Sequence, residues 1–164
     1  MLEVKITKDI IKNSCQKAFE KGLIKSSVDY FTIKDLIGLE ILKSILECSE
    51  KENKDYHLIC EENSYRVKTD ITNTEPKPYH ECIVKSYNSR QKFDRYIFVR
   101  VQFINDVPKR AWIAGWIDKK DYFKKSINLK KGEVDESNGM EIKFNCQKLK
   151  IKELNEIHPI TCTQ

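Results

Sequence analysis

Glycine and proline are scarce in this sequence, with 5 and 4 residues respectively in a chain of 164. A chain so poor in both residues argues against a long flexible linker or a low-complexity tail. The glycines also form neither a G-x-x-x-x-G-K-[ST] loop nor a G-x-G-x-x-G loop, which excludes these two phosphate-binding motifs.

Long apolar segments are absent too. No run approaches the roughly 18 apolar residues that mark a candidate membrane-spanning helix. The first residues, MLEVKITKD, lack the apolar core of a signal peptide. We therefore expect an intracellular protein without a membrane partner, cytoplasmic or, in a eukaryote, nuclear.

Cysteine and histidine do not form the usual metal-binding patterns. The six cysteines include no C-x-x-C pair, and the three histidines show neither zinc-finger spacing nor an H-x-x-x-H pattern. Cysteines of a protein without a signal peptide are expected to be reduced. Cys48, Cys60 and Cys82, which have apolar neighbours, are predicted to be core residues.

Composition and length predict one folded domain. Hydrophobic residues make up 40% and charged residues 34% of the sequence. The length fits a single domain, residues 1–164, with one core. The net charge of +5 permits contact with nucleic acid without establishing it. Lysine pairs at 119–120, 124–125 and 130–131 are the expected electropositive surface, and a plain solvated face explains them equally well.

Two helices are predicted near the N-terminus from apolar residues at helical spacing. The first covers residues 7–22, with Thr7 or Asp9 as its N-cap. The second covers about residues 32–50 and has a broad apolar stripe. Gly38 lies inside this stripe and weakens the helix relative to alanine, so we expect a close backbone approach there.

The chain after residue 55 is dominated by short segments rich in β-branched and aromatic residues, which predict strands. Trp112 and Trp116 lie four residues apart in one of them, so we expect both on the same face, where they favour hydrophobic packing over base stacking. The predicted strands are residues 56–61, 64–69, 81–87, 95–103, 110–117 and 138–151.

The order of these elements predicts the fold class. Residues 87–93 and 104–109 are expected to be hairpin connections, and residues 118–133 a short helix followed by a turn. Helices followed by a run of strands predict an α+β, α/β/α-like fold. In this fold the N-terminal helices pack on a central mixed, mostly antiparallel sheet.

One predicted strand carries charged residues in a pattern typical of catalysis. In ENSYRVKT, residues 62–69, side chains alternate between faces, so Arg66 and Lys68 are predicted opposite Val67. Polar residues therefore line the face of the strand that points away from the N-terminal helices.

A carboxylate in the apolar stripe of the second helix, Glu40, needs a partner, because a buried charge is costly unless it is paired or binds a cation. Two arrangements are open. In the first, Glu40, Glu62 and Lys68 converge, the two carboxylates bind Mg²⁺ or Mn²⁺, and Lys68 assists an attacking water. In the second, Glu40 forms a salt bridge with Arg66 or Lys68.

Four segments follow one another over most of the chain: LIGLE, EENSYRVKT, CIVKSYNSRQKFDRYIFVRV and WIAGWIDKKDYFKK. In this order they resemble small phage and microbial members of the PD-(D/E)XK, restriction-endonuclease-like superfamily. The resemblance implies a restriction-endonuclease-like core and Mg²⁺- or Mn²⁺-dependent phosphodiester hydrolysis. It also implies that Glu40 and Glu62, or Glu61 in place of Glu62, are metal ligands and that Lys68 is catalytic.

The sequence departs from that family at Arg66, which stands where the acid-x-Lys motif has its carboxylate. A guanidinium has no acceptor and does not lose its proton, so Arg66 cannot bind a metal ion. Two functions therefore stay open. One is a metal-dependent DNA or RNA nuclease with a modified active site. The other is a catalytically inactive binding, inhibitor or assembly protein with a nuclease-like fold.

Basic residues on and after the strands predict contact with DNA or RNA, and a protein partner or a homo-oligomer also fits the sequence. Arg66 and Lys85 are expected to bind phosphate directly. The others form a basic tip around an aromatic residue, Tyr87, which suits a nucleic-acid backbone. The predicted nucleic-acid-binding residues are Arg66, Lys85, Arg90, Lys92 and Arg95.

Overall fold

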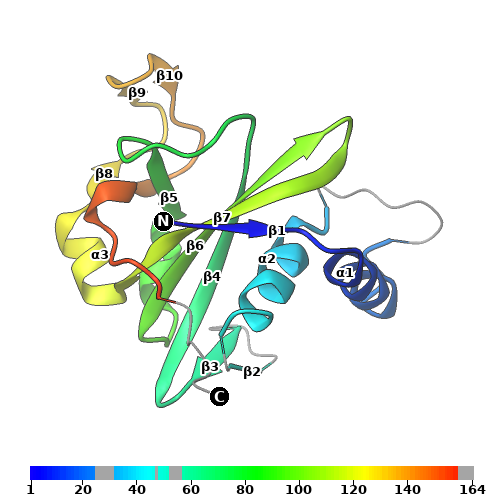
Figure 1. The fold of residues 1–164 in the computed structure, drawn as a ribbon. Helices are drawn as coiled ribbons and strands as arrows, with labels where there is room; N and C mark the ends of the chain where they lie inside the picture. The colour runs from blue at the N-terminus through cyan, green and yellow to red at the C-terminus, as the bar shows by residue number, and fades with distance from the viewer. Residues whose placement is uncertain (25–31, 47, 52–56, 159–164) are drawn as a thin grey trace.

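The computed structural model describes residues 1–24, 32–46, 48–51 and 57–158. A six-stranded sheet runs through the molecule, with other elements on both of its faces (Figure 1). Its strand order is β1-β7-β6-β4-β3-β2. These strands are β1 (Leu2–Lys5), β2 (Ser49–Glu50), β3 (Leu58–Cys60), β4 (Asn63–Thr72), β6 (Arg95–Ile104) and β7 (Val107–Asp118).

Strand pairing in this sheet is mixed and mostly antiparallel. Only β4 and β6, among the neighbouring pairs of the six strands described, run parallel. The predicted hairpin between β6 and β7 is confirmed. Its two turn residues, Asn105 and Asp106, have φ values of 51° and 60°, as a type I′ turn requires. The predicted α+β class is therefore confirmed, as is the packing of helices on the sheet.

Two helices, α1 (Lys8–Glu20) and α2 (Lys34–Lys43), pack on one face of the sheet. Thr7 caps α1, because its hydroxyl accepts a hydrogen bond of 3.3 Å from the Ile10 amide. Gly38 makes the predicted close approach: a Cβ at this position would lie 2.0 Å from Thr69 Oγ1 of β4. No helix among the residues described is long and apolar enough to cross a membrane.

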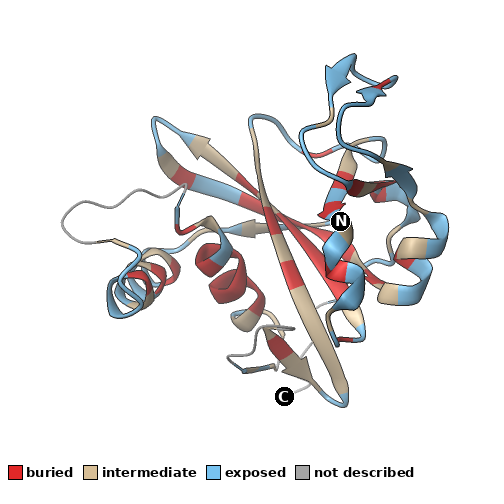
Figure 2. Ribbon diagram, turned by 180° about the vertical axis from the view of Figure 1, so that it is seen from behind, coloured by how far each residue is buried: buried red, intermediate tan, exposed pale blue. Residues whose placement is uncertain are grey.

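The core of this first face is formed by side chains of α2 and of alternate positions in the central strands. Burial is concentrated on α2 and the strands beneath it (Figure 2). Because side chains alternate along a strand, the residues between them point to the second face. The completely or almost completely buried members include Ile33, Ile37, Ile41, Leu42, Leu58, Val67, Ile97, Val99, Val101 and Ile113.

The second face is covered by a helix, α3 (Lys119–Lys125), and by a smaller sheet of order β5-β11-β8. Tyr122 of α3 joins them, because its hydroxyl lies at hydrogen-bond donor distance from the carbonyl oxygens of Cys82 and Gln147, 2.9 and 2.8 Å away. The remaining elements are β5 (Glu81–Lys85), η1 (Ser86–Arg90), β8 (Ile127–Leu129), β9 (Val134–Asp135), β10 (Met140–Glu141), β11 (Cys146–Lys150) and η2 (Ile151–Glu153). The β9–β10 hairpin projects from this side of the molecule (Figure 1).

The second helix is shorter than predicted, and this end of the prediction is wrong. It ends at Lys43, and Ser49–Glu50 form β2 beside β3. A disulfide joins Cys48 to Cys60, so the prediction that these two cysteines are reduced is also wrong. The helical pattern of residues 48–50 does not produce a helix because residues 49–50 pair with β3 instead, and tertiary contacts override local propensity. Cys15, Cys82 and Cys146 are free thiols, as predicted.

Two further predictions about the strands are wrong. Residues 87–93 do not connect a hairpin: they contain most of η1, and β5 pairs with β11 rather than with β6.

Trp112 and Trp116 lie on opposite faces rather than on one. Trp116 is opposite Ile97 of the first-face core, whereas Trp112 is opposite Arg100 on the other side of the sheet. A register shift leaves Ala114 as an extra residue in β7, which inverts the alternation between the two tryptophans.

Candidate functional site

The carboxylate of Glu40 lies between α1 and α2, where the residue is only 7% exposed. Its Oε1 atom accepts hydrogen bonds from Lys17 Nζ at 2.7 Å and Lys43 Nζ at 3.2 Å. Both ammonium groups also pair with Glu50 of β2. Burial alone would raise the pKa of Glu40, but the hydrogen bonds from the two lysines hold it below its ordinary value. The predicted need for a cationic partner is met by Lys17 and Lys43 instead of Arg66 or Lys68.

Arg66 and Lys68 lie on the opposite face of β4 from buried Val67, as the strand alternation predicts. Burial, and after it the nearby charge of Arg66, lower the pKa of Lys68 to about 8 against the opposing effects of Asp35 and Asp70. Lys68 therefore holds its proton less firmly than an ordinary lysine.

The structure does not bring the three predicted catalytic residues together. Glu40 is on the face of the sheet that α1 and α2 cover, Lys68 is on the other face, and Glu62 is exposed in the turn that precedes β4. Within the part of the chain that is described, no three His, Cys, Asp or Glu residues are grouped in a way that could hold a metal ion. The engagement of Glu40 by two ammonium groups does not fit the predicted Mg²⁺ or Mn²⁺ site.

Two residues predicted to bind nucleic acid do meet, in a groove of about 620 Å³. Lys85 at the end of β5 and Arg90 at the end of η1 both line it. We call it the basic groove, because its lining includes four cationic side chains and no Asp or Glu from the described residues. Its lining residues are Lys85, Ser86, Tyr87, Ser89, Arg90, Lys131, Lys143, Phe144 and Asn145.

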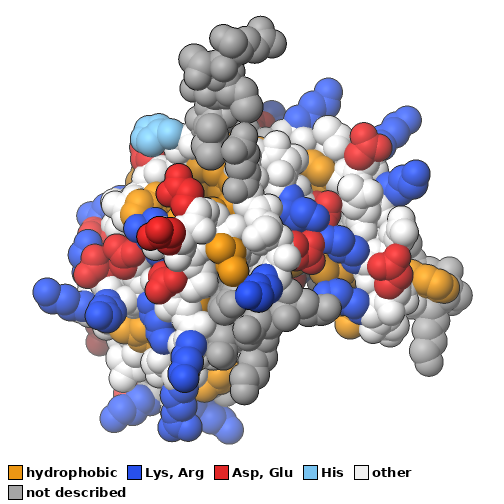
Figure 3. Space-filling view, turned by 90° about the horizontal axis from the view of Figure 1, so that it is seen from below, with side chains coloured by type: hydrophobic (Ala, Val, Ile, Leu, Met, Phe, Trp, Pro, Cys, Tyr) orange, Lys and Arg blue, Asp and Glu red, His pale blue; other side chains and the backbone are white. Residues whose placement is uncertain are grey.

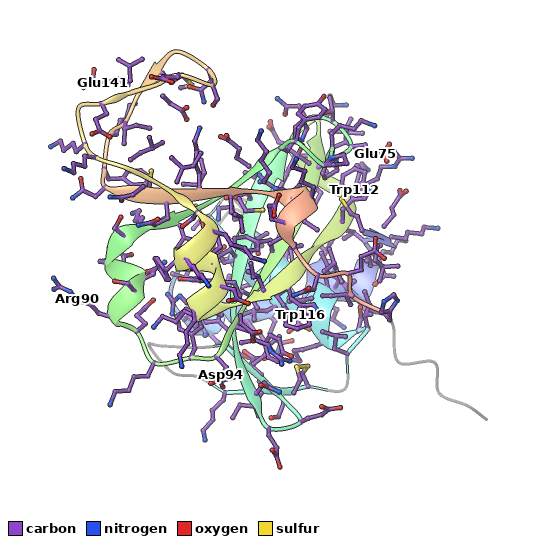
Figure 4. The ribbon with its side chains drawn as sticks, turned by 90° about the vertical axis from the view of Figure 1, so that its left-hand side faces the viewer. Glu75, Arg90, Asp94, Trp112, Trp116 and Glu141 are labelled. Carbon is purple, nitrogen blue, oxygen red and sulfur yellow. A yellow bond between two sulfur atoms is a disulfide. The ribbon has the colours of Figure 1, made fainter. Side chains whose placement is uncertain are left out.

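Two segments distant in sequence form the walls of the basic groove. One wall is the end of β5 with η1, and the other comes from residues 131 and 143–145 at the base of the β9–β10 hairpin. Figure 4 shows this hairpin, with Glu141 near its tip, standing over η1, while Arg90 points outward from η1. Asn145 joins the walls: its carbonyl accepts from the Ser86 amide at 2.9 Å, and its side-chain Oδ1 accepts from the Lys131 amide at 2.8 Å.

Aromatic side chains accompany the cations. Tyr87 is 60% exposed and Phe144 is 45% exposed, so two large aromatic side chains lie at the surface here. Lys85 Nζ lies 5.1 Å from the centre of the Phe144 ring, which is a cation–π distance. Exposed rings next to cations offer both stacking surfaces and charge to a ligand.

The other three predicted nucleic-acid-binding residues lie outside the basic groove. Lys92 is exposed in the loop after η1. Arg95 forms an ion pair of 3.0 Å with Asp118 and stacks on Trp116, with its guanidinium carbon 4.3 Å from the ring centre. Arg66 belongs to the second face of the central sheet, opposite Tyr96 of β6. These three therefore do not extend the cationic lining.

Sequence reasoning missed half of the basic groove. Lys131 belongs to a lysine pair already recognised as electropositive, but nothing in its spacing connects it to Lys85. The signal that could have identified the second wall is the doublet Lys143–Phe144, a cation beside an aromatic residue in a polar segment. The pairing of β11 with β5, which places Cys146 opposite Lys85, brings the two walls together.

The total charge of the molecule does not single out this groove. On the face shown in Figure 3, acidic and basic side chains are intermingled over most of the described surface. Charges mixed in this way provide little attraction for an anion at any one place on this face. The local lining of the basic groove, with cations and no carboxylate among the residues described, is what distinguishes it.

Comparison with known proteins adds no assignment. No protein-family model and no curated protein matches this chain. The resemblance to the PD-(D/E)XK superfamily therefore stays a prediction from the sequence motifs.

Proposed function

We propose that this protein binds DNA or RNA through the basic groove. The observation that carries the proposal is the lining itself, in which Lys85, Arg90 and two further lysines lie beside two exposed aromatic rings. Lys and Arg side chains bind phosphates by charge and hydrogen bonding, and aromatic rings stack on bases. An acidic peptide would use the cations but not the rings, so the combination favours nucleic acid.

Binding rather than hydrolysis is the activity that we propose. Phosphodiester hydrolysis by the predicted site requires Glu40 and Glu62 to share a metal ion near Lys68. The separation of Glu40 and Lys68 by the central sheet argues against that arrangement. We therefore propose a nucleic-acid-binding protein in which Glu40, a predicted catalytic residue, is paired with Lys17 and Lys43.

A fluorescence anisotropy titration with labelled DNA and RNA oligonucleotides tests the proposal. The groove variant carries Lys85→Gln, Arg90→Gln, Lys131→Gln and Lys143→Gln. Its matched control removes the same number of charges from exposed lysines elsewhere, as Lys5→Gln, Lys8→Gln, Lys12→Gln and Lys109→Gln. Both variants have the same net charge, so a difference between them reports the location of binding.

We expect the wild type and the control variant to bind and the groove variant to lose affinity. If four phosphates are neutralised, the logarithm of the affinity should fall with the logarithm of salt concentration with a slope of about −3 for a single strand. Equal loss in the two variants would contradict binding in the groove. Cleavage products with Mg²⁺ or Mn²⁺ that disappear in Lys68→Ala and Glu40→Gln would replace the proposal with the nuclease.

A further inference from the structure

A second cavity adjoins the basic groove and has a different chemistry. Its volume is about 330 Å³, and it shares Ser86, Ser89 and Asn145 with the groove. It lies between η1, α3, β8 and β11, and we call it the amide pocket. Its lining residues are Ser86, Ser89, Phe123, Asn128, Lys130, Asn145 and Gln147.

Hydrogen bonds within the protein orient the three amides of the pocket. Asn128 Oδ1 accepts from Gln147 Nε2 at 3.1 Å, and Asn145 Oδ1 accepts from the Lys131 amide at 2.8 Å. Because the oxygens of both asparagines have these partners, their NH₂ groups are the ends that can donate to a ligand. The third amide, Gln147, uses its own oxygen to accept from Ser126 at 2.7 Å.

Ser86 marks the junction of the amide pocket and the basic groove. Ser86 Oγ is inaccessible to solvent and has no hydrogen-bond partner among the residues that are described. Ser86 lines both the amide pocket and the basic groove, so it lies where the two cavities meet. Because its hydroxyl oxygen is closed to solvent, we do not count it among the groups that the pocket offers to a ligand.

The pocket suits a nucleobase in size and in hydrogen bonding. Its volume falls within the range of about 300 to 1,000 Å³ typical of small-molecule sites. Amide NH₂ groups match the carbonyl oxygens and ring nitrogens at the edges of bases. Half-buried Phe123 supplies an aromatic side chain to the lining, and Lys130 adds a cation.

We propose that the amide pocket receives one unstacked base of a single-stranded nucleic acid whose backbone lies in the basic groove. This inference rests on the proposed function, because it uses the basic groove as the phosphate site. A base can enter such a pocket only when it is out of the helical stack, and removal from a duplex costs unpairing energy. The protein therefore selects single strands over duplexes, and strands with bases over abasic strands.

The experiment compares three labelled ligands of equal length: a single-stranded oligonucleotide, the same backbone with abasic sites throughout, and a duplex. The abasic strand keeps the phosphates and removes only the bases. We expect wild-type protein to bind the strand with bases about tenfold more tightly than the abasic strand, in line with the usual effect of base stacking. The duplex should also bind more weakly than the base-containing single strand.

The variant Asn128→Ala tests whether the preference for the base-containing strand arises in the amide pocket. Asn128 is exposed, so the variant should keep its thermal midpoint, which is measured alongside. We expect it to bind the base-containing strand several-fold more weakly than wild type does, with no change for the abasic strand, because the rings of the basic groove still stack on other bases. The control Gln16→Ala, an exposed amide on α1, should behave as wild type.

The two proposals fail in different ways. Equal wild-type affinity for the base-containing and abasic strands would overturn the amide pocket and leave only phosphate binding in the basic groove. Tighter binding of the duplex would overturn it as well. Absence of binding to every ligand would instead overturn the proposed function.

Discussion

The ammonium nitrogen of Lys148 lies 2.6 Å from Asp135 Oδ1, and neither residue is more than 5% exposed. The same ammonium group is 2.9 Å from Glu81 of β5, and Asp135 Oδ1 also accepts from the amide and hydroxyl of Ser137. The hydrogen bond from Lys148 is the main reason that the pKa of Asp135 is lowered to about 2. This ion pair ties the β9–β10 hairpin to β5 and β11, the strands that lead into the basic groove.

Lys148→Met should destabilise the fold and loosen one wall of the groove. The substitution leaves two carboxylates without their shared cation, and breaking a buried ion pair in this way costs about 3–5 kcal/mol. Urea unfolding should show the loss, and oligonucleotide affinity should fall in conditions where the variant stays folded. Lys150→Met, exposed and two residues further along β11, should change neither quantity. Wild-type stability in Lys148→Met would show that the pair does not anchor the hairpin.

Gly38→Ala should be destabilising although alanine favours helix. The added Cβ would lie 2.0 Å from Thr69 Oγ1, and overpacking of this kind costs about 1–3 kcal/mol. Helix propensity recovers only about 1 kcal/mol of that cost. Thermal or urea unfolding measures the difference.

The double variant Gly38→Ala/Thr69→Ala serves as the control for this contact. Removal of the Thr69 hydroxyl makes room for the new methyl group, so part of the lost stability should return. If Thr69→Ala instead adds its own loss to that of Gly38→Ala, the contact between the two residues is not the cause.

Lys68→Met should stabilise the protein at neutral pH. At pH 7 the lysine is protonated in the folded and the unfolded chain, and burial together with Arg66 makes that charge unfavourable in the fold. Methionine keeps much of the side-chain length without the charge. A higher thermal midpoint than wild type is the expected result, whereas a lower one would mean that the ammonium group has a stabilising partner.

Lys68 should also make the free energy of unfolding depend on pH, and the sign of this dependence follows from its lowered pKa. The pKa of Lys68 falls from 10.5 to about 8 on folding. Between these values the unfolded chain binds more protons, so this group makes wild-type stability rise as pH increases. The advantage of Lys68→Met over wild type should therefore shrink from about pH 8 to pH 10.5. Unfolding curves across that window test it, with Lys109→Met as an exposed control whose difference from wild type should stay flat.

Local patterns predicted much of the fold correctly. Apolar spacing with a cap at Thr7 or Asp9 predicted α1, and residues 104–109 between two apolar strands predicted the β6–β7 connection. Alternation along β4 correctly placed Arg66 and Lys68 opposite Val67. These features depend on neighbours within a few residues, where propensity and periodicity act directly.

Features that depend on distant segments could not be predicted. The pattern of residues 32–50 looked helical to its end, but Cys48 joins Cys60 and Glu50 joins the lysines around Glu40. One extra residue in β7 was enough to move Trp112 and Trp116 to opposite faces. Strand pairing decides such positions, and a shift by one residue exchanges the two faces of a strand.

The candidate site follows the same division. The sequence by itself determined that Lys85 and Arg90 are cations at the end of a strand, close to an aromatic residue, and that Glu40 requires a cationic partner. Only the tertiary structure decided which groups they meet. The β5–β11 pairing sets Lys85 and Arg90 opposite Lys131 and Lys143, more than forty residues away along the chain, and α1 brings Lys17 to Glu40. A charge's own position is a local property, whereas the charges around it come from packing of segments that sequence spacing does not relate.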